Sequence, residues 1–135
     1  MAYWLMKSEP DVYPWEKLVA DGTGGWDGVR NHLAARHLRA MQVGDDAFFY
    51  HSNIGRAIVG IMRVVRTAYP DPTDATGKFV MVDVAPVQAL ARPLSLEEIK
   101  ADKMLSAMVF VKQPRLSVSP VHPHEWARIL QLTKK

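Results

Sequence analysis

Short apolar runs separated by polar turns follow one another along the chain, a pattern typical of strands alternating with short helices. Residues 2–6 are apolar and aromatic and lead into Ser8-Glu9-Pro10, which predicts a strand followed by a turn. Pro14 suits the first turn of a helix, where its missing N–H costs no hydrogen bond. Residues 30–41 carry apolar side chains on one side and basic ones on the other at helical spacing, which predicts an amphipathic helix.

The rest of the chain predicts further strands and two more helices. The strands are expected at residues 47–51, 57–67, 78–87, 107–111 and 115–118. The run 78–87 is apolar on both faces except at Asp83, so it is either covered on both sides or curled into a barrel. Ser95 and Glu98 have the spacing of a capping box that opens a short helix, and Pro123 opens the last helix. The expected fold class is α+β, a mixed, mostly antiparallel β-barrel with peripheral helices.

Length and composition describe one globular domain spanning residues 1–135. The chain has no cysteine, which excludes disulfides, a thiolate nucleophile, a cysteine zinc site and an iron–sulfur cluster. No run approaches the roughly 18 apolar residues that a membrane helix needs, and the first ten residues do not read as a secretory signal. We therefore expect a soluble, cytoplasmic protein with no membrane partner.

The net charge of +3 is compatible with a polyanionic partner but does not require one. The distribution of charge is more informative, because residues 28–44 contain no acidic side chain. The basic side chains of this stretch are Arg30, His32, Arg36, His37 and Arg39. A solvated helix face beside an acidic neighbour would explain the same pattern.

No conventional active site emerges from the motifs. There is no Gly-x-Ser-x-Gly elbow and no phosphate-binding Gly-Lys-Ser/Thr loop. His32 and His37 are five residues apart, which does not stack them on one helix face, and His122 and His124 have no carboxylate at ligand spacing. We expect no catalytic residues, no metal site and no cofactor.

Polar clusters at the ends of apolar elements indicate a binding site instead. They occupy residues 7–10, 26–31, 48–53 and 115–118. Strand ends around a barrel mouth are places where ligand pockets form. Each cluster also has a structural explanation, since Ser8 could cap a turn and Asn31 a helix. Trp26 lies among glycines, where an indole either plugs the core or lies against a planar ligand, and the residues leave both options open.

The sequence resembles the EVE domain family in five blocks that follow the family order over essentially the whole chain. The blocks are residues 3–10, 26–31, 48–53, 81–84 and 115–118. The resemblance implies a PUA-like fold, a small curved β-barrel flanked by helices, related to YTH domains. It also implies a reader of modified bases, chiefly modified cytosine in DNA and also considered for modified RNA, with no catalytic activity assigned. The short start of the chain resembles the compact bacterial members.

Together, the clusters and the resemblance predict that one base leaves the stack and enters an aromatic and polar pocket. Trp26 would lie on the base face, and Tyr50 or another aromatic side chain would close the opposite side. The residues expected to line this base pocket are Lys7, Ser8, Glu9, Trp26, Asn31, Tyr50, His51, Ser52, Asn53, Arg115 and Ser117. The residues expected to contact phosphates are Lys7, Arg30, Arg36, Arg39 and Arg56.

Two alternatives of other classes stay open at this point. One is an enzyme acting on modified nucleosides or RNA, as ASCH domains are thought to be, with Lys7, Ser8, Glu9 and His51 as acid, base and stabiliser. The other is a small-molecule or protein interaction module. A monomer is favoured, but no feature of the sequence requires it. The sequence leaves open the modification that is bound and the choice between DNA and RNA.

Overall fold

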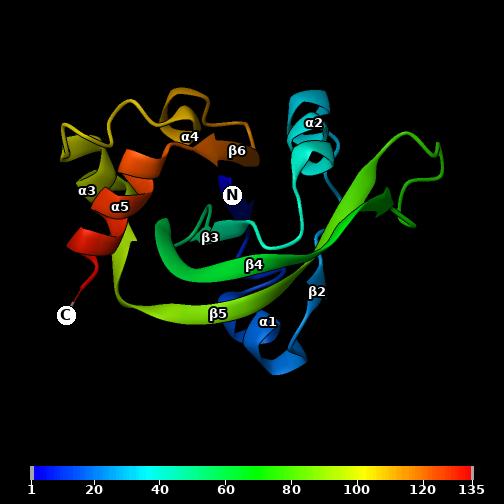
Figure 1. Cartoon of the computed structure of the whole chain (residues 1–135), viewed down its shortest axis with the longest axis horizontal. Coiled ribbons are helices and arrows are strands. Elements are labelled where there is room, and N and C mark those ends of the chain that lie inside the picture. The colour runs from blue at the N-terminus through cyan, green and yellow to red at the C-terminus, as the bar shows by residue number, and fades with distance from the viewer. Residues whose placement is uncertain (1, 135) are drawn as a thin grey trace.

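Six strands and five helices make up the computed structural model, which describes residues 2–134 (Figure 1). In chain order they are β1 (Tyr3–Ser8), α1 (Trp15–Asp21), β2 (Gly24–Gly25), α2 (His32–Ala40), β3 (Asp46–His51), β4 (Ala57–Pro70), β5 (Val80–Ser95), α3 (Leu96–Ala101), α4 (Val109–Lys112), β6 (Val118–Val121) and α5 (Pro123–Leu132). Within this described part, no helix has the length and apolar content that crossing a bilayer requires.

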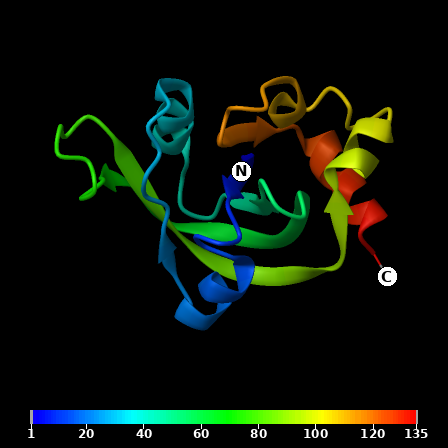
Figure 2. The ribbon, with the colours of Figure 1, turned by 180° about the vertical axis from the view of Figure 1, so that it is seen from behind.

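All six strands belong to one sheet with the order β2-β5-β4-β3-β1-β6. β1 and β3 pair in parallel, and every other pair is antiparallel. The long strands β4 and β5 curve beneath β3, and their far end projects beside α2 in both views (Figures 1 and 2). The expected α+β class and the mostly antiparallel pairing are therefore confirmed.

The prediction of a closed barrel is wrong, because β2 and β6 form the two edges and do not pair with each other across residues 2–134. Both edge strands are short. β2 consists of two glycines, and β6 contains Pro120, which has no N–H to donate. Register shifts along the β4–β5 pair accompany its curvature, so the sheet bends strongly while remaining open.

Apolar side chains cover both faces of the sheet and form two cores. Along β1, Trp4 and Met6 belong to the first core and Leu5 to the second, as the two-residue period of a strand requires. Phe49 and Phe48 on β3 divide in the same way. Helices α1 and α2 contribute to the first core, and α3, α4 and α5 contribute to the second.

Local signals for helix starts are largely confirmed. The Asn31 side chain accepts a hydrogen bond of 2.9 Å from the N–H of Ala34 and so caps α2. Ser95 and Glu98 form the capping box of α3. Pro123 opens α5, whose Trp126 ring stacks on Phe48 with centroids 3.9 Å apart.

Two strand predictions near the C-terminus are corrected. Residues 107–111 were expected to be extended, but Val109–Lys112 form α4, which places Phe110 against Tyr50 with ring centroids 5.1 Å apart. The β-branched residues favour a strand locally, and burial of Phe110 in the second core outweighs that preference. The predicted strand 115–118 begins only at Val118, because residues 113–116 make a turn closed by a 3.0 Å backbone hydrogen bond.

Candidate functional site

A cleft of about 970 Å³ lies where β1 and β3 end. β1 and β3 are parallel neighbours, with Lys7 opposite Tyr50 and Ser8 opposite His51. Their polar C-terminal ends therefore lie next to each other at the same end of the sheet. Further lining residues come from the loop after β1, the loop that precedes α2, the β3–β4 turn, α3 and the α4 region. The topology thus brings together clusters that lie more than forty residues apart in the sequence.

Trp26 forms part of the cleft while being anchored in the first core. Its side chain is 7% exposed, and its ring meets Phe49 edge-on with centroids 5.4 Å apart. Its backbone N–H donates a 2.8 Å hydrogen bond to the carbonyl of Val82. Trp26 therefore packs in the core, as one of the two options expected, and also borders the cleft. Its contact with a planar ligand stays a prediction.

Tyr50 and Phe110 bring the second core to the same cleft. Burial raises the pKa of the Tyr50 hydroxyl to about 12, so this group is protonated at neutral pH. Tyr50 lines the open cleft. A protonated hydroxyl in this position is available to donate to a bound molecule.

Hydrogen bonds hold the polar side of the cleft in place. The Ser8 hydroxyl donates to the carbonyl of Tyr13 at 2.6 Å, and the Ser52 N–H donates to the carbonyl of Ser8 at 2.9 Å. The Asn53 amide donates to the Glu9 carboxylate at 3.4 Å, from a backbone with φ of 72°. The loop before α1 and the β3–β4 turn are thereby joined.

Positive charge predominates along the cleft, where five cationic side chains meet only two carboxylates. The cations are Lys7, Arg30, Arg56, Lys100 and Arg115, and the carboxylates are Glu9 and Asp27. The Lys7 ammonium donates to the carbonyl of Pro114 at 2.8 Å, and burial lowers its pKa. Lys100 and Arg115 have no ion-pair partner in the part of the chain that the structure describes.

Arg30 is restrained by its neighbours. Its guanidinium pairs with the buried carboxylate of Asp71 at 3.1 Å, donates to Thr73 at 2.9 Å and lies 5.4 Å from the ring centroid of Phe79. Arg56 is held only weakly, at 3.8 Å from the exposed carboxylate of Glu97.

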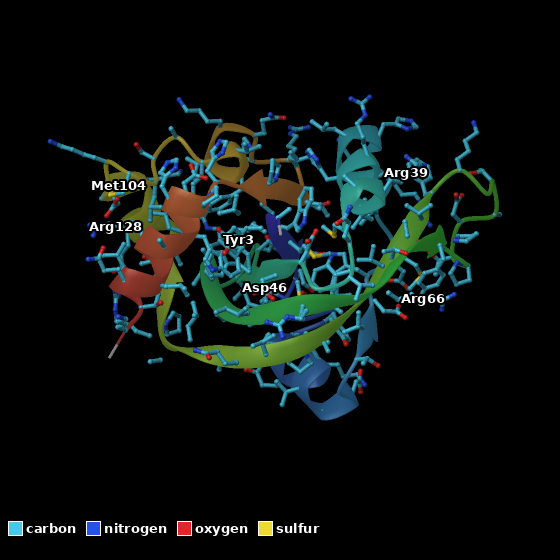
Figure 3. The ribbon with its side chains drawn as sticks, viewed as in Figure 1. Tyr3, Arg39, Asp46, Arg66, Met104 and Arg128 are labelled. Carbon is cyan, nitrogen blue, oxygen red and sulfur yellow. The ribbon has the colours of Figure 1, made fainter. Side chains whose placement is uncertain are left out.

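Four residues expected in the site are not brought to this cleft. Asn31 caps α2 and lies with Arg115 in a neighbouring depression of about 370 Å³. The His51 Nε2 accepts a hydrogen bond of 3.1 Å from the N–H of Trp15, and burial lowers its pKa. Arg36 is not among the lining residues. Arg39 donates to the carbonyl of Lys78 at 2.8 Å and so lies beside the β4–β5 hairpin (Figure 3).

Sequence reasoning missed several residues that border or support the cleft. Phe110 stood in a run interpreted as a strand, and Tyr13, Lys100 and Asp71 carried no distinguishing pattern. Among residues 2–134, no three His, Asp or Glu side chains gather as a metal site would require. The arrangement is suited to a planar, partly polar group flanked by anions: aromatic rings from two cores, fixed donors and acceptors, and surrounding cations.

A family model and similar proteins align with nearly the whole chain. The model of the EVE domain family matches residues 2–132. Mouse thymocyte nuclear protein 1 is 40% identical over 164 aligned residues, which cover 96% of this chain and 73% of that protein.

Two solved structures share the fold. A Rhodopseudomonas palustris protein solved by NMR has a TM-score of 0.93 at 50% identity, covering 98% of this chain and 93% of that one. The human THYN1 protein, solved in complex with DNA containing 5-methylcytosine, has a TM-score of 0.90 at 36% identity, covering 100% of this chain and 99% of that one. The matched residues and the shared fold lead to one conclusion: the chain belongs to the EVE domain family.

Proposed function

We propose that this protein binds DNA that contains a modified cytosine and holds the modified base, extruded from its strand, in the cleft. The observation that carries the proposal is the convergence of Trp26 from one core with Tyr50 and Phe110 from the other on a single cationic cleft. The human THYN1 protein, which aligns over the whole chain, was solved with DNA containing 5-methylcytosine, and this supports the choice of ligand.

Aromatic and polar groups have separate tasks in this proposal. Trp26 and Tyr50 contact the base, where stacking on one aromatic ring is worth about 1–3 kcal/mol. Ser8, Glu9, Ser52, Asn53 and Ser117 line the cleft and are proposed to read the edge of the base. An incorrect base leaves such groups unpaired, at a cost of about 1–3 kcal/mol each. The methyl group itself adds about 1 kcal/mol through its burial, so selectivity over plain cytosine is modest.

The cationic side chains contact the phosphates on both sides of the extruded base. Lys7, Arg56, Lys100 and Arg115 border the cleft, and Arg30 lies among them in its pair with Asp71. Arg36 and Arg39 lie outside the lining and would contact only a longer DNA segment. Phosphate contacts of this kind position the strand without reading sequence, and they weaken steeply as salt is added.

The test is equilibrium binding of short single-stranded and duplex oligonucleotides at low and moderate salt. The central cytosine would be plain, methylated, hydroxymethylated or carboxylated, and matched RNA would be included. The proposal expects preference for one modified cytosine in DNA, with affinity falling as salt rises. Equal affinity for plain and modified DNA would contradict it.

Two further outcomes would favour the alternative functions. Chemical change of the oligonucleotide or nucleoside, detected by mass spectrometry, would favour an enzyme. Binding of a metabolite for which no nucleobase competes would favour a small-molecule module. The cytoplasmic location and the monomeric state expected from the sequence stay predictions, and the curated mouse relative is named as a nuclear protein.

A further inference from the structure

Two exposed apolar side chains lie at the border of the cleft. Val12 lines the cleft and is 72% exposed. Ile54 is 59% exposed and stands between Asn53 and Arg56, which both line the cleft. A single exposed aliphatic residue needs no explanation. Two of them beside a polar, cationic opening are a specific feature of this surface.

The backbone presents Ile54 on a tight turn. Its N–H donates to the carbonyl of Ser52 at 2.8 Å, and the flanking Asn53 and Gly55 have φ values of 72° and 60°. These left-handed conformations reverse the chain within a few residues, so the isoleucine occupies the tip. The isoleucine is therefore exposed on a short, defined turn whose neighbours Asn53 and Arg56 line the cleft.

Val12 stands on the loop that this turn contacts. The Val12 N–H donates to the carbonyl of Glu9 at 3.0 Å, and the Glu9 carboxylate accepts from the Asn53 amide at 3.4 Å. Both aliphatic side chains thus belong to one connected rim, which we define as residues 9–12 and 52–56. Arg56 adds a cation at the end of the rim, two residues from Ile54.

We infer that Ile54, with Val12 on the neighbouring loop, enters the space left in a DNA duplex by the base that moves into the cleft. The inference rests on the proposed function and assigns the two exposed aliphatic side chains of the rim a task on the duplex, in addition to the contacts that hold the base. Extruding a base costs a few kcal/mol of lost stacking and pairing. An aliphatic wedge restores apolar contact with the bases that remain, and Ile is among the side chains that proteins use in this way.

The wedge has a consequence that distinguishes it from the cleft. A single-stranded oligonucleotide has no paired stack to open, so Ile54 is needed for duplex DNA and is dispensable for a single strand. A mismatch at the target cytosine removes part of the pairing cost and reduces the need for the wedge. Residues that hold the base itself, by contrast, matter equally for both forms of DNA.

The experiment compares Ile54→Ala and Val12→Ala with Val43→Ala. Val43 is a matched control, since it is 64% exposed and lines neither the cleft nor the neighbouring depression. Affinity is measured for one modified oligonucleotide as a single strand, as a duplex and as a duplex with a mismatch at the target. We expect Ile54→Ala to weaken duplex binding by roughly tenfold and to leave single-strand binding unchanged. Val12→Ala should weaken duplex binding less. Ile54→Leu keeps a large aliphatic side chain and should bind duplex DNA as the wild type does.

A fluorescent reporter tests the same point independently of affinity. With 2-aminopurine beside the modified cytosine, the wild-type protein should raise the fluorescence of the duplex, and Ile54→Ala should raise it less at saturation. Equal losses on single strand and duplex, or no loss on either, would overturn the wedge while leaving the proposed function intact. A wild-type protein that binds no modified DNA would instead overturn the proposed function.

Discussion

The carboxylate of Asp71 accepts a hydrogen bond of 2.8 Å from the backbone N–H of Gly28, 43 residues earlier in the chain. The Asp71 side chain is fully buried and also accepts from the Arg30 guanidinium and from the N–H and hydroxyl of Thr73. It therefore fastens the loop that carries Trp26 to the end of the β4–β5 hairpin. One side wall of the cleft depends on a residue that does not line it.

Replacing Asp71 with Ala should destabilise the protein and weaken DNA binding together. The change leaves the Gly28 N–H without its acceptor and releases Arg30, at a cost of about 2 kcal/mol. Urea unfolding and oligonucleotide binding would measure the two effects. Asp74→Ala is the control, because Asp74 bonds to Thr76, Lys78 and Phe79 within its own turn. Asp74→Ala should lower stability but leave DNA binding unchanged. Equal losses of DNA binding in both variants would contradict the role given to Asp71.

Acid should remove the contribution of Asp71 to stability. Burial raises the pKa of this carboxyl, but hydrogen bonds from Thr73, Gly28 and Arg30 outweigh burial and hold it at about 2, against an ordinary value of 3.8. Because the folded-state pKa is depressed, the stabilisation is complete above the unfolded value and is lost as pH falls through the folded one. About 2 kcal/mol should disappear between about pH 4 and pH 2. Unfolding curves of the wild type and Asp71→Asn should converge over that interval, and a constant gap would refute the prediction.

Trp26→Phe should weaken binding of modified DNA more than it alters the fold. The smaller ring keeps an aromatic side chain in the first core and gives up part of the surface that faces the cleft. Trp15→Phe is the matched control, because Trp15 is equally buried, meets Phe49 edge-on at 5.4 Å and does not line the cleft. Thermal unfolding should change similarly in the two variants, whereas affinity should fall only for Trp26→Phe. A parallel loss of affinity would remove the stacking role from Trp26.

Tyr50→Phe isolates the hydroxyl that the second core delivers to the cleft. Because the change keeps the ring packed in the second core and removes only the hydroxyl, stability should hardly change. Affinity for modified DNA should fall by about 1 kcal/mol, the worth of one hydrogen bond. Tyr3→Phe serves as the control, since the Tyr3 ring stacks on Trp126 away from the cleft. Unchanged binding by Tyr50→Phe would show that the hydroxyl does not contact the ligand.

Gly60→Ala should disrupt the first core. A Cβ on Gly60 would lie 2.6 Å from Cη2 of Trp15, which is part of a rigid ring packed against Phe49. Overpacking of this kind costs about 1–3 kcal/mol, and thermal or urea unfolding would measure the loss. The added Trp15→Phe change opens space and should recover part of it. If Gly60→Ala unfolds like the wild type, the close approach of the indole is not required for stability.

Local chemistry explains which features could be predicted from the sequence. The caps at Asn31 and Ser95 and the apolar run that forms β1 depend on neighbours within a few residues, and the structure contains them. Whether the edge strands β2 and β6 pair to close the sheet depends on the curvature of the whole sheet. No local sequence pattern records that curvature.

In the candidate site, too, features set by local sequence could be predicted and features set by distant contacts could not. The polar ends of β1 and β3 could be recognised as clusters, and their parallel pairing brings them together. The sequence predicts a strand at Phe110 because its β-branched neighbours favour one. The structure has a helix there, which buries Phe110 beside Tyr50. Asp71 could not be found, since a loop aspartate becomes a buried anchor only through partners 41 and 43 residues away.

The division of the apolar interior by the sheet has a consequence for folding cooperativity. Trp26 belongs to one core and Tyr50 and Phe110 to the other, and all three border the same cleft. Under the proposed function, a base held there would contact both halves of the interior at once. Because only the folded state can bind it in this way, occupancy favours the native protein by mass action. The proposed function therefore predicts that ligand binding is coupled to the joint unfolding of the two halves.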